Sequence, residues 1–239
     1  MKSLFLFVFI AGSLFGQGVE VIYEAKTLYP EEVLKLAPAI ANTDVLYRYK
    51  LQINDNKSVF NKESFYVKKM DGQMGGGIMA ETIYKDFSNN VVITSSAKYK
   101  EGKCLGETID DWKDKSVYTN KWELSDEEKT ISGISCKKAT RGSTTVWYST
   151  NHPFQDGPGN VIYPVPGLVL EVINPGYHYV AIDFKEFDGE IFMPADLDRS
   201  ENEAEITSDY LSTNYLVGKD NCMSFKEAPV GTWVSLNKR

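Results

Sequence analysis

The strongest structural signal in this sequence is a two-residue periodicity of apolar side chains. Val19, Val21 and Tyr23 alternate with polar or charged neighbours, and the same pattern recurs over residues 47–53. Successive residues of a β-strand point to opposite sides of a sheet, so this alternation predicts strands with one buried face and one solvated face.

Short polar turns join three pairs of such segments. The pairs that we expect to form hairpins are 82–87 with 91–97, 134–140 with 144–150, and 168–173 with 177–187. Parallel strands need long crossover connections, so consecutive hairpins indicate an antiparallel sheet.

Helical signals are confined to two short segments. Pro30 suits the first turn of a helix over residues 31–37, and Pro38 should end it. Part of 200–211 is a second candidate, because acidic residues cluster at its start. We therefore expect an all-β, mainly antiparallel fold, built as a curved sheet or open half-barrel with one or two short helices.

The N-terminus has the layout of a secretory signal peptide. Lys2 precedes an apolar run over residues 4–10, and small residues follow as far as Gly16. A membrane-spanning helix needs about 20 apolar residues, which this run does not reach. We predict a signal peptide over residues 1–16 and a single antiparallel β domain over 17–239. The protein is then exported to the periplasm, secreted or held at the cell surface, without spanning the membrane.

The charge of the chain argues against one class of partner. Its 33 acidic residues exceed its 26 basic ones, which gives a net charge of −7, and the bases form no block. Binding to nucleic acid depends on basic residues that neutralise phosphates, so no nucleic-acid partner is expected.

The three cysteines, Cys104, Cys136 and Cys222, allow at most one intramolecular disulfide. Three pairings are open, and we favour Cys104–Cys136 because both residues lie in the strand-rich middle of the chain. The alternative is that all three are small buried apolar residues.

No set of residues has the spacing of a catalytic or metal site. Ser149, His152 and Asp156 fall in one segment, whereas the members of a Ser-His-Asp triad come from separate elements. The acidic cluster at 196–203 lacks the glycine and spacing of a calcium loop. We therefore predict no catalytic residue, no metal and no cofactor.

Five short motifs occur in order between Trp122 and Phe184. They are Trp122-Glu123-Leu124, a segment over 129–140 that contains Cys136-Lys137-Lys138-Ala139-Thr140, Val146-Trp147-Tyr148-Ser149-Thr150, a Pro153 to Gly157-Pro158 loop, and Pro166-Gly167-Leu168. This order resembles the GLPGLI family of exported proteins from Bacteroidetes-type bacteria, with the likeness concentrated in residues 122–184. The resemblance implies an exported β protein and no established activity.

The loop at residues 153–166 contains four of the nine prolines, and several glycines lie beside them. Proline fixes φ, so this connection should be rigid. One interpretation is a loop that joins two hairpins. The other is a rim beside a concave sheet face, with candidate ligand-binding residues Trp147, Tyr148, Phe154, Tyr163, Pro166, Gly167 and Leu168.

These observations favour a non-enzymatic envelope binding or accessory protein. It would hold an apolar, lipid-like ligand or a partner polypeptide on a concave sheet face. One alternative is a hydrolase of envelope polymers that uses carboxylates such as Asp183, Glu186 and Glu190. Another is a structural or assembly protein that pairs through an exposed edge strand.

Overall fold

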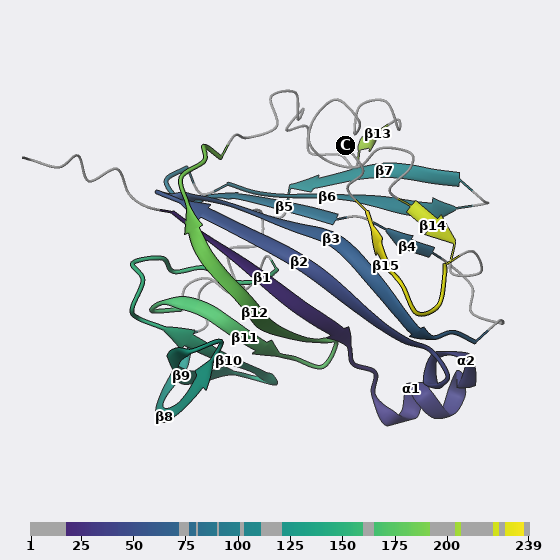
Figure 1. Cartoon of the computed structure of the whole chain (residues 1–239), viewed down its shortest axis with the longest axis horizontal. Helices are drawn as coiled ribbons and strands as arrows, with labels where there is room; N and C mark the ends of the chain where they lie inside the picture. Colours follow the sequence, from purple (N-terminus) through teal and green to yellow (C-terminus); the bar gives the residue numbers. More distant parts are fainter. Residues whose placement is uncertain are drawn as a thin grey trace, which may run out of the picture.

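Antiparallel strands make up most of the protein, as the alternation predicted (Figure 1). The computed structural model describes residues 18–71, 77–79, 81–89, 91–100, 103–110, 121–159, 165–191, 204–206, 222–224 and 228–236. The strands are β1 (Gly18–Thr27), β2 (Asp44–Asn54), β3 (Lys57–Lys69), β4 (Gly77–Met79), β5 (Glu81–Asp86), β6 (Val91–Lys100), β7 (Lys103–Asp110), β8 (Glu123–Ile131), β9 (Ile134–Arg141), β10 (Thr144–Ser149), β11 (Leu168–Ile173), β12 (Tyr177–Phe187), β13 (Ala204–Ile206), β14 (Cys222–Ser224) and β15 (Trp233–Ser235). The helices are α1 (Glu31–Leu36) and α2 (Pro38–Ala41).

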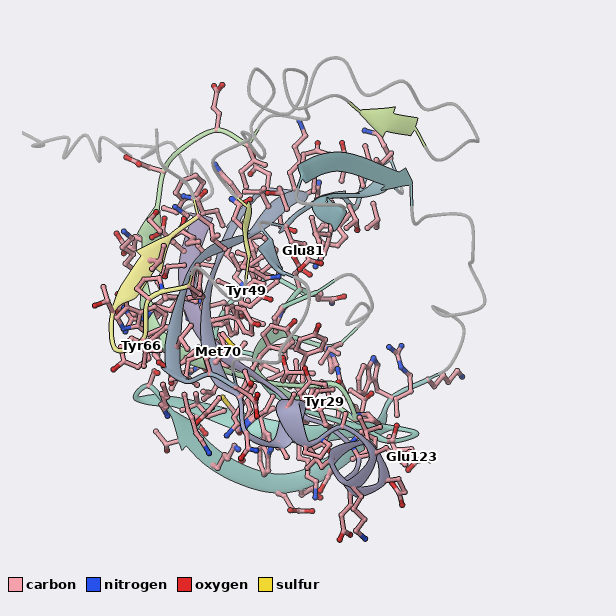
Figure 2. All side chains as sticks on the ribbon, turned by 90° about the vertical axis from the view of Figure 1, so that its right-hand side faces the viewer. Tyr29, Tyr49, Tyr66, Met70, Glu81 and Glu123 are labelled. Atoms are coloured by element: carbon pink, nitrogen blue, oxygen red, sulfur yellow. The ribbon has the colours of Figure 1, made fainter. Side chains whose placement is uncertain are left out.

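One large sheet joins the two ends of the described chain. Its order is β13-β7-β6-β5-β3-β2-β1-β12-β11-β10-β9-β8, and β15 pairs with the far end of β3. The sheet is open rather than closed into a barrel. Seen along the strands, it curls so that β6 and β7 lie above the hollow and β8 lies below it (Figure 2). The predicted curved, open antiparallel fold is therefore confirmed.

The three predicted hairpins are present as β5–β6, β9–β10 and β11–β12. Helix α1 covers the expected segment, and Pro38 ends it but also occupies the first turn of α2, where its missing N–H is not needed. The second predicted helix is wrong where the structure describes it. Residues 204–206 form strand β13, which pairs with β7.

The main hydrophobic core lies on the inner side of the curl. It contains Val21, Tyr23 and Leu51 from the middle of the sheet, together with residues of β9, β10 and β11 from the lower arm. The Tyr23 hydroxyl donates a hydrogen bond of 2.6 Å to the carbonyl oxygen of Val169, which ties the middle strands to that arm.

A buried ion pair attaches the proline-rich loop to the sheet. Lys85 Nζ on β5 lies 2.6 Å from Asp156 Oδ1, and the two side chains are 2% and 0% exposed. Lys85 also donates to the Gly157 carbonyl oxygen at 3.1 Å, and the Ser58 hydroxyl donates to Asp156 Oδ2 at 2.5 Å. Charged groups this deeply buried require such partners, so the cluster fixes where the loop lies.

Candidate functional site

Five tyrosines gather on the inner side of the sheet, at the end where α1 and α2 lie. We call this set the tyrosine face; its members are Tyr29, Tyr47, Tyr49, Tyr177 and Tyr179. The ring centroids of Tyr49 and Tyr179 are 5.3 Å apart, those of Tyr177 and Tyr179 are 5.6 Å apart, and those of Tyr47 and Tyr49 are 6.5 Å apart. Figure 2 shows Tyr49 inside the curl and Tyr29 beside α1, whereas Tyr66 lies on the outer side.

The strand register explains how these large rings fit together. Ala25 on β1 lies opposite both Tyr47 on β2 and Tyr179 on β12. The alanine leaves room between the two tyrosines, so that rings from non-adjacent strands approach across β1. In the turn between β11 and β12, the Asn174 side chain accepts hydrogen bonds from the backbone N–H groups of Gly176 and Tyr177. These bonds fix the turn that positions Tyr177 at the start of β12.

On β2 and β12, which flank β1, the tyrosine nearer the end where α1 and α2 lie is the more exposed one. On β2, Tyr49 is 1% exposed and Tyr47 is half-buried. On β12, Ala181 and Tyr179 are buried, whereas Tyr177 is 40% exposed, as is Tyr29 beyond the end of β1. The hollow is thus packed with core residues at one end and presents aromatic rings to solvent at the other.

Lys62 and Glu81 add a charged pair to the tyrosine face. Lys62 Nζ lies 3.6 Å from a Glu81 carboxylate oxygen, and it is 5.3 Å and 5.5 Å from the ring centroids of Tyr47 and Tyr49. Burial lowers the pKa of Lys62, and the Glu81 carboxylate opposes that shift. The ring faces and the carboxylate together hold an ammonium group in a largely apolar surrounding.

Burial shifts the pKa values of several tyrosines in this face upward. Burial raises the pKa of Tyr49 well above its ordinary value, and nearby Tyr179 and Glu81 add to the effect. Burial is also the main cause of the raised pKa of Tyr47 and of Tyr177. These phenols are therefore neutral at physiological pH and offer hydroxyl groups on apolar rings.

A cavity of about 390 Å³ continues the tyrosine face under the two helices. Tyr29 and Tyr47 belong to both the face and the cavity wall. The remaining lining residues are Lys26, Thr27, Leu28, Leu34, Ile40, Ala41, Thr43, Asp44 and Val45. The volume falls in the range of roughly 300–1,000 Å³ that small-molecule sites occupy.

Most of the candidate rim residues lie elsewhere. Tyr148, Phe154 and Leu168 are buried in the main core, so they have almost no surface to offer a ligand. Pro166 is exposed, and Tyr163 lies outside the described residues. The structure therefore favours the interpretation in which this loop joins two hairpins.

Gly167 serves packing rather than ligand contact. A Cβ atom at this position would overlap the Ser149 carbonyl oxygen and come within 2.8 Å of its carbonyl carbon. The backbone of Gly167 thus packs directly against the end of β10, an approach that only glycine permits.

Trp147 is half-buried, packs against the main core and also contacts a polar cluster. It pairs with Glu171 in the β10–β11 register, and Lys129 Nζ is 4.4 Å from its ring centroid. Glu171 is 6% exposed and forms an ion pair with Lys129. His178 Nε2 lies 2.8 Å from the Glu171 carboxylate. The cluster connects β8, β11 and β12 on the side of the sheet opposite Tyr179.

Cys136 is a free, buried thiol, so the predicted Cys104–Cys136 disulfide is not formed in this structure. The two residues belong to β9 and β7, and eight strands lie between these in the sheet order. A disulfide requires Cα atoms within about 7 Å of each other. Burial raises the pKa of the Cys136 thiol to about 11.

The carboxylates proposed for a hydrolase and the edge strand proposed for assembly are both exposed to solvent. Asp183, Glu186 and Glu190 all lie at the surface, so none has the desolvated setting of a general acid. The edge strand β8 carries exposed acids at 126–128, which oppose pairing with another strand. The acidic cluster at 196–203, considered above as a metal site, lies outside the described residues.

Within the described ranges, no group of three or more metal-ligating side chains comes together. In the same part of the chain, no helix has the length and apolar character needed to cross a bilayer.

Comparison with known proteins yields distant structural similarity. No family model and no curated protein matches the chain. Two crystal forms of PNGF-II resemble it. The P21 form has a TM-score of 0.43 and 18% identity, and the C2 form has a TM-score of 0.41 and 17% identity. Each match covers 73% of this chain but only 29% or 28% of PNGF-II, so the chain spans less than a third of that protein. At these values the likeness carries no argument about function.

Sequence reasoning recognised Tyr47 and Tyr49 as strand residues but did not place them in a site. Lys62 and Glu81 were missed altogether. The signal that could have found the site was the same alternation in 45–53 and 177–181, where the inward positions of both segments hold tyrosines.

Proposed function

We propose that the protein is a non-catalytic binding protein that holds an amphipathic, lipid-like ligand on the tyrosine face. The observation that carries the proposal is the open end of the hollow, where Tyr47 and Tyr177 are accessible beside the buried Tyr49 and Tyr179. Large exposed apolar patches mark binding sites, and ligand sites are typically concave and lined by apolar and aromatic side chains.

The chemistry of the face supports an amphipathic rather than a purely apolar ligand. Tyrosine rings offer apolar area, while their hydroxyl groups form hydrogen bonds at the ring tip. Lys62 and Glu81 provide one positive and one negative group for the polar part of the ligand. The pair carries no net charge, so it selects for polarity rather than for one sign of charge.

The location of the protein is part of the proposal. A segment with the layout of a signal peptide at 1–16 and the GLPGLI-like motifs at 122–184 support export to the bacterial envelope, where lipids and lipid-linked compounds are available.

Native mass spectrometry of the full-length protein from its own host tests this function. The wild-type protein should carry a bound small molecule that dissociates on activation in the gas phase. Tyr177→Ala removes an exposed ring of the face and should weaken binding about 2- to 10-fold, which corresponds to one aromatic contact.

Ile182→Ser provides the matched control. Ile182 lies on the same strand and is 42% exposed, close to the 40% of Tyr177, but it is the residue that the β1–β12 register skips and it belongs to neither the tyrosine face nor the cavity wall. This variant should bind as the wild type does. Equal loss of the bound molecule in both variants, or no bound molecule in the wild type, would overturn the proposal.

A further inference from the structure

The two short helices cover the cavity without filling it. Leu34 on α1 and Ile40 on α2 line the cavity, and both are only half-buried. Neither helix contains a fully buried residue. A helix packed against a sheet ordinarily buries its apolar stripe, so the inner residues of α1 and α2 lack the atoms that would complete their packing.

Aliphatic side chains from four segments line the cavity. Leu28 follows β1, Leu34 and Ile40 come from the helices, and Val45 begins the buried side of β2. An occupant of this space would contact these aliphatic side chains and also the polar residues Lys26, Thr27, Thr43 and Asp44.

Some polar groups of the cavity wall have partners within the protein, although the buried Asp44 Oδ1 accepts no hydrogen bond from the described residues. The Thr43 hydroxyl donates to the Ala39 carbonyl oxygen at 2.8 Å, and Lys26 Nζ lies 3.5 Å from Asp44 Oδ1. A polar ligand would have to compete with these contacts, whereas an apolar one would leave them intact.

We infer that the cavity under α1 and α2 is a subsite for one unbranched hydrocarbon chain of the ligand. Tyr29 and Tyr47 belong to both the cavity wall and the tyrosine face, so a chain in the cavity continues directly into a polar group on that face. This inference rests on the proposed function and names the part of the ligand that each surface binds. A saturated acyl or alkyl chain satisfies the walls, and its head group lies near Lys62 and Glu81.

Binding of dodecanoate to the full chain, followed by isothermal titration calorimetry, tests the subsite. Leu34→Trp fills the cavity from α1 and should weaken dodecanoate binding about tenfold, because it displaces roughly two methylene groups of the chain. Leu36→Trp is the matched control on the same helix. Leu36 is 86% exposed and lies outside the cavity wall, so this variant should bind as the wild type does.

Two further measurements keep the result interpretable. Ala41→Phe fills the cavity from α2 and should reproduce the loss if Leu34→Trp fails to fold, as judged by circular dichroism. Dodecyl maltoside below its micellar concentration should compete with dodecanoate, since the cavity recognises the chain and not the charge of the head group.

The outcomes separate this inference from the proposed function. If Tyr177→Ala weakens dodecanoate binding while Leu34→Trp and Ala41→Phe do not, the face binds ligand and the subsite is refuted. If the wild type does not bind dodecanoate, the subsite is also refuted. The proposed function then depends only on the molecule that co-purifies from the host.

Discussion

Removing the negative charge of Asp156 should destabilise the protein severely. In Asp156→Asn, Lys85 keeps its charge at 2% side-chain exposure and loses the carboxylate that lies 2.6 Å from its Nζ. Breaking one partner of a buried ion pair costs about 3–5 kcal/mol. Domains have a total stability of about 5–15 kcal/mol, so the loss is a large part of the whole.

Urea unfolding followed by circular dichroism measures this effect. A loss of that size should lower the unfolding midpoint by roughly 1 M or more, given a slope of at most about 3 kcal/mol per M. The double variant Lys85→Met/Asp156→Leu removes both charges and should recover most of the stability, because no unpaired charge remains buried. The coupling between the two positions is read from the full double-mutant cycle.

Lys35→Met is the matched control, since it breaks the exposed pair of Lys35 and Glu31 on α1. Pairs at 70% and 78% side-chain exposure are screened by water, so the midpoint should not change measurably. The reasoning is refuted if Asp156→Asn alters the free energy of unfolding by less than about 1 kcal/mol, which would mean that water reaches the pair.

Three further predictions concern packing and titration. Gly167→Ala should lower the free energy of unfolding by about 1–3 kcal/mol, because the added methyl group overlaps a backbone carbonyl. In Gly176→Ala the methyl group meets only an ordinary contact, so equal urea midpoints for the two variants would contradict this prediction. Burial raises the pKa of Tyr23 and of Tyr49, so the folded state holds their protons more tightly than the unfolded state does. The free energy of unfolding should therefore fall as pH rises above about 10. Tyrosinate absorbance that appears well before unfolding would contradict this prediction. The pKa of Cys136 is about 11 in the folded protein, so iodoacetamide should alkylate it about a hundredfold more slowly there than in the urea-unfolded protein. Mass spectrometry measures the two rates, and equal rates would show that the thiol is accessible.

The alternation of apolar and polar residues was sufficient to predict the strands and hairpins of this fold, but not the pairing of strands that are distant in the sequence. The three hairpins follow from alternation and turn residues within about 20 residues of chain. The pairing of β1 with β12 joins segments more than a hundred residues apart, and nothing in either segment specifies the other. Because this pairing places Ala25 between Tyr47 and Tyr179, the tyrosine face could not be assembled from the sequence.

The burial of several candidate rim residues could not be predicted for a related reason. Alternation states which residues share a face of a strand, but it does not state which part of that face other segments cover. Tyr148 on β10 and Phe154 in the loop are both buried in the main core, and the Lys85–Asp156 contact holds the loop two residues beyond Phe154. Lys85 and Ser58, which hold that loop, come from strands far from it in the sequence, so no local motif predicts the contact.

The most direct test of the tyrosine face is the NMR spectrum of its rings. Protein with labelled tyrosine side chains would be titrated with a lipid extract of the host envelope, and assignments would come from single Tyr→Phe variants. The account predicts that the ring signals of Tyr47 and Tyr177 shift as the extract is added, while those of Tyr66 on the outer side stay in place. Shifts confined to Tyr66, or no shift at any of the three, would contradict it.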